Sequence, residues 1–362
     1  MTVNSSPDHI ATQDSLHILM SQQAIDSYGA QLEAIEGVGE IHWLTLESAP
    51  DAAGTYPTDI SFLSRDITGA STKTKVLPPL ARYYEILRAS PGLRWVHAHS
   101  AGVDRPIYPE LLARGVRVTS SSGANAAPVA HTAVAAVLAL GRQFAVQIPA
   151  QHQRRYAPML GHPQLHDITG QTAMVVGLGS IGLRIAQYLQ ALGLKVMGVT
   201  HQPGKHLAAQ AGGGEGAPAV AGYPVYSYAQ MDAHLPSANY LVLACPLTPT
   251  TSRLIHAQRL AQLRRGAYLV NVARGEVCVE QDLIAALQSG QLGGAFLDGF
   301  EVEPLSTESP LWDLPNVMLS AHTAGHFTGH ADNVAKIFID NVTRYVRGNA
   351  TSKALRNEVT SM

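Results

Sequence analysis

A single histidine stands where an apolar run of the sequence stops, in the stretch LSAHTAGH. His322 ends the run VMLSA and is followed by the small residues Thr323 to Gly325, which cannot cover its ring. Imidazole titrates near neutral pH, so a histidine in this position can pass a proton to or from a bound molecule. A lone histidine at a strand end is usually structural, and it indicates catalysis only where other motifs agree.

A glycine-rich stretch, GLGSIG, lies between the apolar run AMVV and a helical pattern. Its glycines are Gly177, Gly179 and Gly182. In a strand–turn–helix unit that binds a dinucleotide, the first glycine allows the tight turn and the second lets the backbone approach the pyrophosphate. The third allows the helix to pack closely on the strand. The amides and the dipole at the helix N-terminus favour an anion. The stretch therefore predicts a dinucleotide-binding site.

The residues after the next apolar run, KVMGV, bear on which dinucleotide binds. An NAD enzyme is expected to carry Asp or Glu about twenty residues after the glycines, where it holds the ribose 2′-hydroxyl. Here Thr200 stands at that place, and His201, Gln202 and Lys205 follow. Without an acid nothing repels a 2′-phosphate, and lysine or histidine can supply positive charge. The pattern favours NADP(H) and leaves NAD(H) open as an alternative.

The elements that must position these motifs predict an α/β fold. From Thr172 on, short apolar runs alternate with amphipathic helical patterns, as in a parallel sheet covered on both faces. The first part of the chain repeats the alternation more weakly and predicts a smaller sheet. We expect two doubly wound domains: a Rossmann cofactor domain at residues 125–333, inserted in a flavodoxin-like substrate domain at 1–124 and 334–362. The last helical pattern should pack on the N-terminal domain.

Composition limits the partners of the chain. Its 362 residues are 46% hydrophobic and 14% charged, with a formal net charge of -2 and no basic block. These values argue against binding to nucleic acid or to an anionic membrane, and they favour a small-molecule partner. We find no apolar run of roughly 18 residues and no pattern of a secretory signal at the start. Two cysteines without metal-ligand spacing fit a reducing compartment, so we expect a cytoplasmic protein.

Four longer stretches together resemble the D-isomer-specific 2-hydroxyacid dehydrogenases, a family that includes glyoxylate and hydroxypyruvate reductases. They are GLGSIGLRIAQYLQALG, CPLTPTTSRLI, AYLVNVARGEVCVEQDLIAALQSGQLGGAFLDGFEVEPL and SPLWDLPNVMLSAHTAG. The similarity runs from about Leu93 to Gly325, with the motifs in the family's order and spacing. The resemblance implies an active site in the cleft between the two domains, reduction of a small 2-keto acid to the D-2-hydroxy acid, and a homodimer. Glyoxylate and hydroxypyruvate are the first substrates to consider.

The resemblance places the family's catalytic residues on Arg274, Glu303 and His322. Each suits the reduction of a 2-keto acid, in which hydride reaches the carbonyl carbon while a proton reaches its oxygen. His322 can donate that proton, and Glu303 against the other ring nitrogen would orient the ring and favour its protonated form. The forked guanidinium of Arg274 can engage both the carbonyl and the carboxylate of the substrate.

The resemblance also implies contacts with cofactor and substrate. Asp298 would lie at the nicotinamide side of the cofactor. The turn that starts at Ser100 would bind the substrate carboxylate through the backbone amides of Ala101 and Gly102. The other implied cofactor contacts are Ser180, Ile181, Cys245, Pro246, Thr251, Val272, Ala273 and Gly325.

Some residues depart from the family's pattern. Ala321 replaces the proline that many members have before the histidine, and His131 stands where an acid is expected. The acid after the second strand is also missing, as described above. His97 and His99 flank the substrate turn, where a packed or solvent-facing role is favoured over contact with substrate.

Two other interpretations of these motifs compete with an enzyme of this kind. The histidines His322, His326 and His330 are four apart, but glycines interrupt the helix that would align them, so we expect no metal site. A dinucleotide-sensing scaffold, like the corepressors that resemble these dehydrogenases, would keep the same motifs and bind the cofactor with little turnover. Formate dehydrogenases pair the histidine with glutamine, and Glu303 argues against them.

Overall fold

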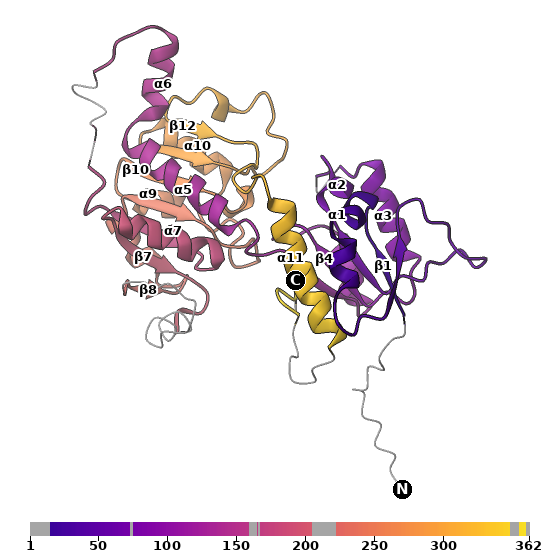
Figure 1. Ribbon diagram of the computed structural model, residues 1–362. Helices are drawn as coiled ribbons and strands as arrows, with labels where there is room; N and C mark the ends of the chain where they lie inside the picture. The colour runs from indigo at the N-terminus through magenta and orange to yellow at the C-terminus, as the bar shows by residue number, and fades with distance from the viewer. Residues whose placement is uncertain are drawn as a thin grey trace. The chain divides into compact units, whose positions relative to one another are not determined.

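The chain forms two compact α/β units in a computed structural model, which describes residues 15–72, 75–158, 165, 167–204, 222–347 and 355–359 (Figure 1). Unit 1 comprises the residues up to Ala124 together with those from Phe327 on, and unit 2 comprises Asn125–His326. The sequence placed the second division between residues 333 and 334. That position lies inside a helix that begins at His330, and the compact unit already starts at Phe327.

Unit 1 contains a five-stranded parallel sheet in the order β2-β1-β3-β4-β5. This is the flavodoxin-like order, as the sequence predicted. Strands β3 and β4 are buried along their whole length, which explains why their sequences, ISFL and WVHA, show no alternation of apolar and exposed polar residues. The strands are β1 (Ser15–Leu19), β2 (Glu40–Leu44), β3 (Ile60–Leu63), β4 (Trp95–Ala98) and β5 (Arg117–Ser120).

Helices cover the sheet of unit 1, and the last of them comes from the far end of the chain. The ring of Phe338 on α11 stacks on Phe62 at a centroid distance of 4.7 Å and lies 5.4 Å from Trp95. The C-terminal helix therefore packs on the N-terminal strands, as expected. The helices are α1 (Gln22–Glu33), α2 (Arg65–Thr68), α3 (Pro78–Arg88), α4 (Ile107–Ala113) and α11 (His330–Val346).

Unit 2 contains a seven-stranded parallel sheet in the order β12-β11-β10-β9-β6-β7-β8. Read from its other edge, the sheet runs β8-β7-β6-β9-β10-β11, which is the Rossmann order 3-2-1-4-5-6 when the strands of the unit are counted from β6. Strand β12 extends the sheet beyond β11. The prediction of two doubly wound sheets, the first of them smaller, is confirmed. The strands are β6 (Thr172–Val176), β7 (Lys195–Val199), β8 (Val225–Tyr226), β9 (Tyr240–Leu243), β10 (Ala267–Asn271), β11 (Leu292–Leu297) and β12 (Val317–Leu319).

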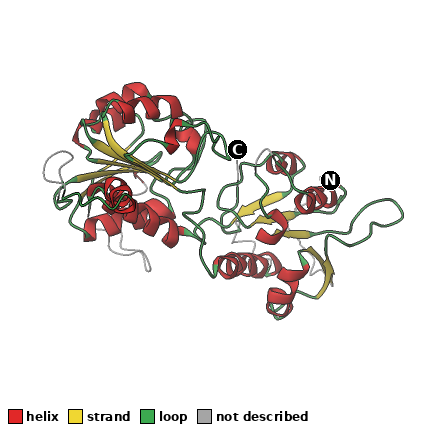
Figure 2. Ribbon diagram, turned by 90° about the horizontal axis from the view of Figure 1, so that it is seen from above, coloured by secondary structure: helices red, strands yellow, loops and turns green. Residues whose placement is uncertain are grey.

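Helices lie on both faces of the unit 2 sheet (Figure 2). The alanine-rich helix α5 buries small side chains against the strands, which allows the helix to lie close to them. The helices are α5 (Ala126–Gly141), α6 (Phe144–His152), α7 (Ser180–Ala191), α9 (Ala257–Gln262) and α10 (Glu280–Gln288), with short 3-10 turns η1 (Met231–Ala233), η2 (Leu235–Ser237), η3 (Gly275–Val277) and η4 (Pro310–Trp312).

The length and hydropathy of the described helices bear on whether any of them could span a membrane. None of them is long and apolar enough to cross a membrane by itself, and only α5 and α6 taken together, across a bend of 74°, meet that test. The glycine- and alanine-rich run Ala209–Gly222, whose composition predicts a surface loop, lies outside the described residues except for Gly222.

Candidate active site

The glycine turn between β6 and α7 shows why each glycine is needed. Gly177 has φ +95°, and a Cβ there would stand 2.5 Å from the backbone nitrogen of Cys245. A Cβ on Gly182 would stand 1.8 Å from the carbonyl oxygen of Gly177, inside the turn itself. A Cβ on Gly179 would meet no described atom within 4 Å, so the space over this residue is open. The first and third glycines serve packing, and the second leaves room for a ligand.

The first turn of α7 faces this open space. Gly179 caps the helix, and Ser180 is exposed while Ile181 is half-buried. The first amides of a helix have no partner within the helix, and they attract an anion such as a pyrophosphate. These residues fit the phosphates of a dinucleotide.

The described residues that follow β7, residues 200–204, include no acidic side chain. The Thr200 amide donates to the Tyr226 carbonyl at 2.9 Å, which fixes the backbone at the strand end. His201 and Gln202 are exposed beside it. Lys205, which the sequence also placed in this site, lies outside the described residues.

The segment after β9 forms a tight turn that Thr251 holds together. The hydroxyl of Thr251 donates to the Pro246 carbonyl at 2.6 Å and accepts from the Thr248 amide at 2.8 Å. Thr251 is buried, so its side chain stabilises the turn that presents Cys245 and Pro246. Burial raises the pKa of the Cys245 thiol to about 12, which keeps it neutral. The predicted cofactor contact of Thr251 stays a prediction.

The loop after β10, which begins at Val272, is shaped by a residue that the sequence analysis did not single out. Asn271 is buried, and its side-chain oxygen accepts from the Ala273 amide at 3.0 Å. Its side-chain nitrogen donates to the Arg274 carbonyl, also at 3.0 Å. The guanidinium of Arg274 donates to the Ala273 carbonyl at 2.9 Å. In the sequence, Asn271 could have been noticed as the polar residue that ends the apolar run AYLV.

Glycine brings the Arg274 loop against the loop that bears Glu303. A Cβ on Gly275 would stand 1.9 Å from the carbonyl carbon of Phe300, so the two backbones are in direct contact there. A Cβ on Gly299 would stand 3.2 Å from a carboxylate oxygen of Glu303. Arg274 and Glu303 are thus neighbours because two glycines remove the side chains that would separate their loops.

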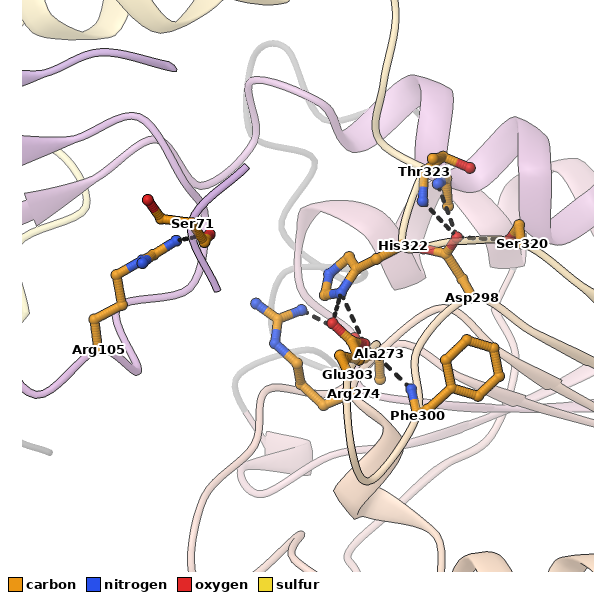
Figure 3. A network of polar contacts seen from close by, with 11 residues as sticks. Ser71, Arg105, Ala273, Arg274, Asp298, Phe300, Glu303, Ser320, His322 and Thr323 are labelled. Atoms are coloured by element: carbon orange, nitrogen blue, oxygen red, sulfur yellow. Dashed lines mark hydrogen bonds and ion pairs between the residues drawn. The ribbon is translucent and has the colours of Figure 1, made fainter. Parts of the chain in front are cut away.

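Glu303 and His322 form a direct ion pair when the histidine is protonated. The two carboxylate oxygens lie 3.0 and 2.9 Å from Nδ1 of the ring, which is turned towards them (Figure 3). One oxygen also accepts from the Phe300 amide at 3.2 Å. Burial acts to raise the pKa of Glu303, but the hydrogen bond and charge of His322, the Phe300 amide and the charge of Arg274 outweigh it and lower the pKa. The carboxylate therefore stays ionised beside the ring.

His322 sits in a backbone conformation that few residues adopt. Its φ is +54°, in the left-handed region, where histidine occurs more often than most side chains other than glycine. Its amide donates to the Asp298 carbonyl at 2.7 Å, which ties the turn to the end of β11. Ala321, where the resemblance led us to expect proline, is exposed.

Asp298 holds the turn that bears His322. A single oxygen of its buried carboxylate, Oδ1, accepts from the Ser320 hydroxyl at 2.6 Å and from the amides of Thr323 and Ala324 at 2.8 and 3.0 Å (Figure 3). We infer from these contacts that Asp298 positions the turn that bears His322. The contact with nicotinamide that the sequence assigned to it stays a prediction.

Gly325, which follows these residues, must also be small. A Cβ there would stand 2.4 Å from the side-chain nitrogen of Asn125 at the start of α5. The exposed His131, further along the same helix, stacks on Tyr188 of α7 at 5.4 Å.

The predicted substrate turn belongs to unit 1. The Ser100 hydroxyl donates to the Gly102 carbonyl at 2.6 Å, and the Ser100 carbonyl accepts from the Ser121 amide at 3.0 Å. These bonds close the turn around Ala101, which is exposed. His97 is fully buried, with its ring nitrogens 2.7 Å from Thr119 and 2.9 Å from Ser121, so it is packed as favoured above.

The described residues contain no group of three or more histidine, cysteine or acidic side chains arranged to hold a metal ion. In particular, His322 turns its ring to Glu303.

Comparison with known proteins gives the class to which this fold and this site belong. Residues 134–324 match the family model described as D-isomer specific 2-hydroxyacid dehydrogenase, NAD binding domain. The chain is 27% identical to a glyoxylate reductase of Korarchaeum cryptofilum, covering 76% of this chain and 80% of the relative. It is 30% identical to a glyoxylate/hydroxypyruvate reductase B of Yersinia enterocolitica, covering 75% and 80%.

A solved structure is similar over nearly the whole chain. It is a D-isomer specific 2-hydroxyacid dehydrogenase of Xanthobacter autotrophicus in complex with NADPH and MES, with a TM-score of 0.69 and 27% identity over 95% of this chain and 97% of that one. The protein is therefore an NAD(P)-dependent oxidoreductase. It belongs to the family of D-isomer specific 2-hydroxyacid dehydrogenases.

Proposed function

We propose that this enzyme reduces a small 2-keto acid of the glyoxylate and hydroxypyruvate class to the D-2-hydroxy acid, with NADPH as the preferred reductant. The observation that carries the proposal is the pairing of His322 with Glu303 at 2.9 Å, in the unit that also holds the glycine turn. The names of the two reductases that are similar to this chain support the substrate class.

His322 delivers the proton in this proposal. Glu303 occupies Nδ1, so Nε2 is the ring nitrogen that faces the substrate oxygen, and the carboxylate favours the protonated ring. The bound cofactor supplies the hydride to the carbonyl carbon. As charge develops on the carbonyl oxygen, the proton moves from Nε2 of His322 to that oxygen.

Cations and amides hold the substrate in place. The guanidinium of Arg274 has donors on more than one nitrogen, so it can bind the keto oxygen or the carboxylate while Nη1 keeps its bond to Ala273. The substrate carboxylate is assigned to the amides of Ala101 and Gly102, in the turn that Ser100 closes. Small residues at these positions let a carboxylate approach the backbone.

The preference for NADPH rests on the segment after β7. Thr200, His201 and Gln202 carry no negative charge that would repel a 2′-phosphate, and the exposed His201 and Gln202 can donate hydrogen bonds to it. The structure in complex with NADPH that resembles this chain supports the assignment.

We further propose a homodimer in which α6 meets a second copy. Phe144 and Ile148 on this helix are 46% and 47% exposed, and Tyr156 just after it is 93% exposed. Large apolar side chains gathered on one exposed segment are typical of a protein interface. The cytoplasmic location stays a prediction.

Turnover is the test of this proposal. The oxidation of NADPH and of NADH is followed at 340 nm with glyoxylate, hydroxypyruvate, pyruvate and a bulkier phenyl keto acid. We expect glyoxylate or hydroxypyruvate to be reduced with the highest kcat/KM, and NADPH to be preferred. If the cofactor binds but none of the keto acids is reduced, the assigned reaction is wrong.

A further inference from the structure

A short segment close to the end of the sequence, residues 355–359, runs along the outer edge of the unit 1 sheet. Strand β5 is the last strand in the order of that sheet. The segment pairs antiparallel with it through a bridge between Thr119 and Glu358, and the Val359 amide donates to the Val118 carbonyl at 2.9 Å. It thus covers hydrogen-bonding groups of an edge strand. The reaction proposed above gives this segment no part.

Asn357 holds the segment to the residues at the end of β5. Its φ is +56°, in the left-handed region, which asparagine enters more readily than most side chains. Its carbonyl accepts from the Ser120 amide at 3.1 Å. Its side-chain nitrogen donates to the carbonyls of Ser120 and Ser122 at 3.1 and 2.8 Å. Residues in such sparsely populated conformations cluster at functional sites, which directs attention to what Asn357 holds.

The peptide group between Ser120 and Ser121 links Asn357 to the proposed substrate turn. The carbonyl of this group is the Ser120 oxygen that accepts from Asn357. Its N–H is the Ser121 amide, which donates to the Ser100 carbonyl at 3.0 Å. Because a peptide group is planar, the two bonds act on one rigid body. Ser100 in turn closes the turn by donating from its hydroxyl to the Gly102 carbonyl at 2.6 Å.

The side chain of Ser121 is buried, and a chain of hydrogen bonds with a single direction holds it. Its hydroxyl donates its one proton to the Ala98 carbonyl at 2.9 Å, so the 2.9 Å contact with Nε2 of His97 requires a proton on that nitrogen. Burial lowers the pKa of His97 to about 3, so the ring is neutral and Nδ1 accepts from the Thr119 hydroxyl at 2.7 Å. Trp95 donates to that hydroxyl at 2.8 Å. A buried network that is fully satisfied in this way is rigid, so Ser121 is a fixed point beside the turn.

We propose that Asn357 is a positioning residue of the substrate site. Through the peptide group that precedes Ser121 it fixes the Ser100 carbonyl. It thereby sets the direction in which the amides of Ala101 and Gly102 point. The inference rests on the proposed function, in which those amides bind the substrate carboxylate. Loss of the side-chain bonds then weakens substrate binding, whereas the transfer of hydride and proton, which is assigned to groups held by unit 2, keeps its rate.

Two substitutions of Asn357 test this role. Asn357→Asp keeps the shape and tolerates the left-handed region, but a carboxylate only accepts hydrogen bonds, so both donations are lost. Asn357→Gly suits the positive φ and removes the same bonds without placing a charge beside the carbonyls. We expect the KM for glyoxylate to rise by about tenfold in each, as the loss of one or two net hydrogen bonds predicts, with kcat and the Kd for NADPH unchanged.

Glu358→Gln is the matched control. Glu358 follows Asn357 in the same segment, and its carboxylate accepts from the Arg117 guanidinium at 2.6 and 2.8 Å. Loss of this ion pair loosens the segment at the other end of β5, so it should lower the melting temperature and leave the KM unchanged. A KM that neither substitution of Asn357 alters, or one that Glu358→Gln raises as much, would overturn the positioning role.

Amide hydrogen exchange separates this inference from the proposed function, because it needs no turnover. The Ser121 amide is protected by its bond to Ser100 and should exchange faster in Asn357→Gly than in the wild type and in Glu358→Gln. If no keto acid is reduced but this difference is observed, the reaction is wrong and the hold of Asn357 on the turn stands. If glyoxylate is reduced while exchange and KM are the same in all three proteins, the reaction stands and Asn357 has no such role.

Discussion

Asp298 and Ser320 are joined by a hydrogen bond of 2.6 Å, through the same carboxylate oxygen that accepts the two amides following His322. The carboxylate of Asp298, which follows β11, thus binds residues on both sides of His322 in the segment that follows β12. We infer that Asp298 positions His322, whose backbone is held in the left-handed region. Strain of this kind persists only where the surroundings enforce it.

Asp298→Ala should therefore damage turnover more than substrate binding. Three hydrogen bonds to the His322 turn are lost, and we expect kcat to fall by about a hundredfold, because misplacing a catalytic group by about 1 Å costs that much. Ser320→Ala removes only one of the bonds and should cost less than tenfold. Steady-state kinetics give the split between kcat and KM. A change confined to KM in Asp298→Ala would argue against a positioning role.

Glu303→Gln should change the pH dependence of the reaction. The pKa of Glu303 is lowered by its contacts, mainly with His322, so the pairing is fully present above the usual range of glutamate and is lost as the pH falls through the lowered pKa. Glutamine keeps the shape but not the charge that favours the protonated ring. We expect kcat of reduction to fall by about tenfold to a hundredfold at neutral pH, as for impaired general acid catalysis, and the difference from the wild type to shrink as the pH falls through the lowered pKa of Glu303. Unchanged pH profiles of the two proteins would contradict the pairing.

The glycine turn allows a prediction that separates packing from ligand binding. Gly182→Ala should prevent stable folding of unit 2, because its methyl group would stand 1.8 Å from the Gly177 carbonyl oxygen. Gly179→Ala meets no described atom within 4 Å and should melt within about 3 °C of the wild type, as a cost under 1 kcal/mol implies. Its Kd for NADPH should nevertheless rise, since the methyl group occupies the space over the amides. Thermal melting and fluorescence titration measure the two effects, and an unaltered Kd would exclude this role of the second glycine.

Asn271→Ala should loosen the loop that bears Arg274. The substitution leaves the Ala273 amide and the Arg274 carbonyl without their side-chain partners, which should cost about 2 kcal/mol of unfolding free energy. We expect the KM for the keto acid to rise, because Arg274 is the residue proposed to bind the substrate. Denaturant unfolding and kinetics with Arg274→Lys as the comparison provide the check. Normal KM with normal stability would show that Asn271 does not support this loop.

Thr200→Asp should reverse the choice of cofactor. A carboxylate at the end of β7 repels the 2′-phosphate and can accept the 2′-hydroxyl of NAD(H). We expect the ratio of kcat/KM for NADPH to that for NADH to fall by about tenfold or more, as for other like-charge contacts of about 1.4 kcal/mol. His152→Ala, a change at an exposed histidine of α6, serves as the control. A wild type that prefers NADH from the outset would refute the argument from the missing acid.

The features that the sequence predicts best are those that a single residue type demands locally. Gly177 and Gly182 were predictable because a Cβ at either position would meet backbone atoms, at 2.5 Å and 1.8 Å respectively. The alternation of apolar runs with amphipathic helical patterns likewise predicted two parallel sheets. His322 was found through its place at a strand end together with a resemblance that extended over most of the chain.

Contacts between distant segments were beyond the sequence. Asp298 reaches Ser320 across 22 residues, and nothing in either motif indicates that one oxygen accepts three bonds. The role of Asn271 depends on the path of the loop after it, which sequence periodicity does not describe. His99 could be seen beside the substrate turn, but its buried and unsatisfied Nδ1 is a property of the folded sheet edge.

The central claim is that His322, oriented by Glu303, donates the proton in the reduction of a 2-keto acid. The most direct measurement is the rate of NADPH oxidation with saturating glyoxylate for the wild type, His322→Ala and the control His152→Ala, with NADPH binding measured in parallel by fluorescence. We expect His322→Ala to bind NADPH normally and to lose turnover by a factor of about 10² to 10⁴, while the control keeps its rate. A His322→Ala protein that binds NADPH and turns over within a few fold of the wild type would contradict it.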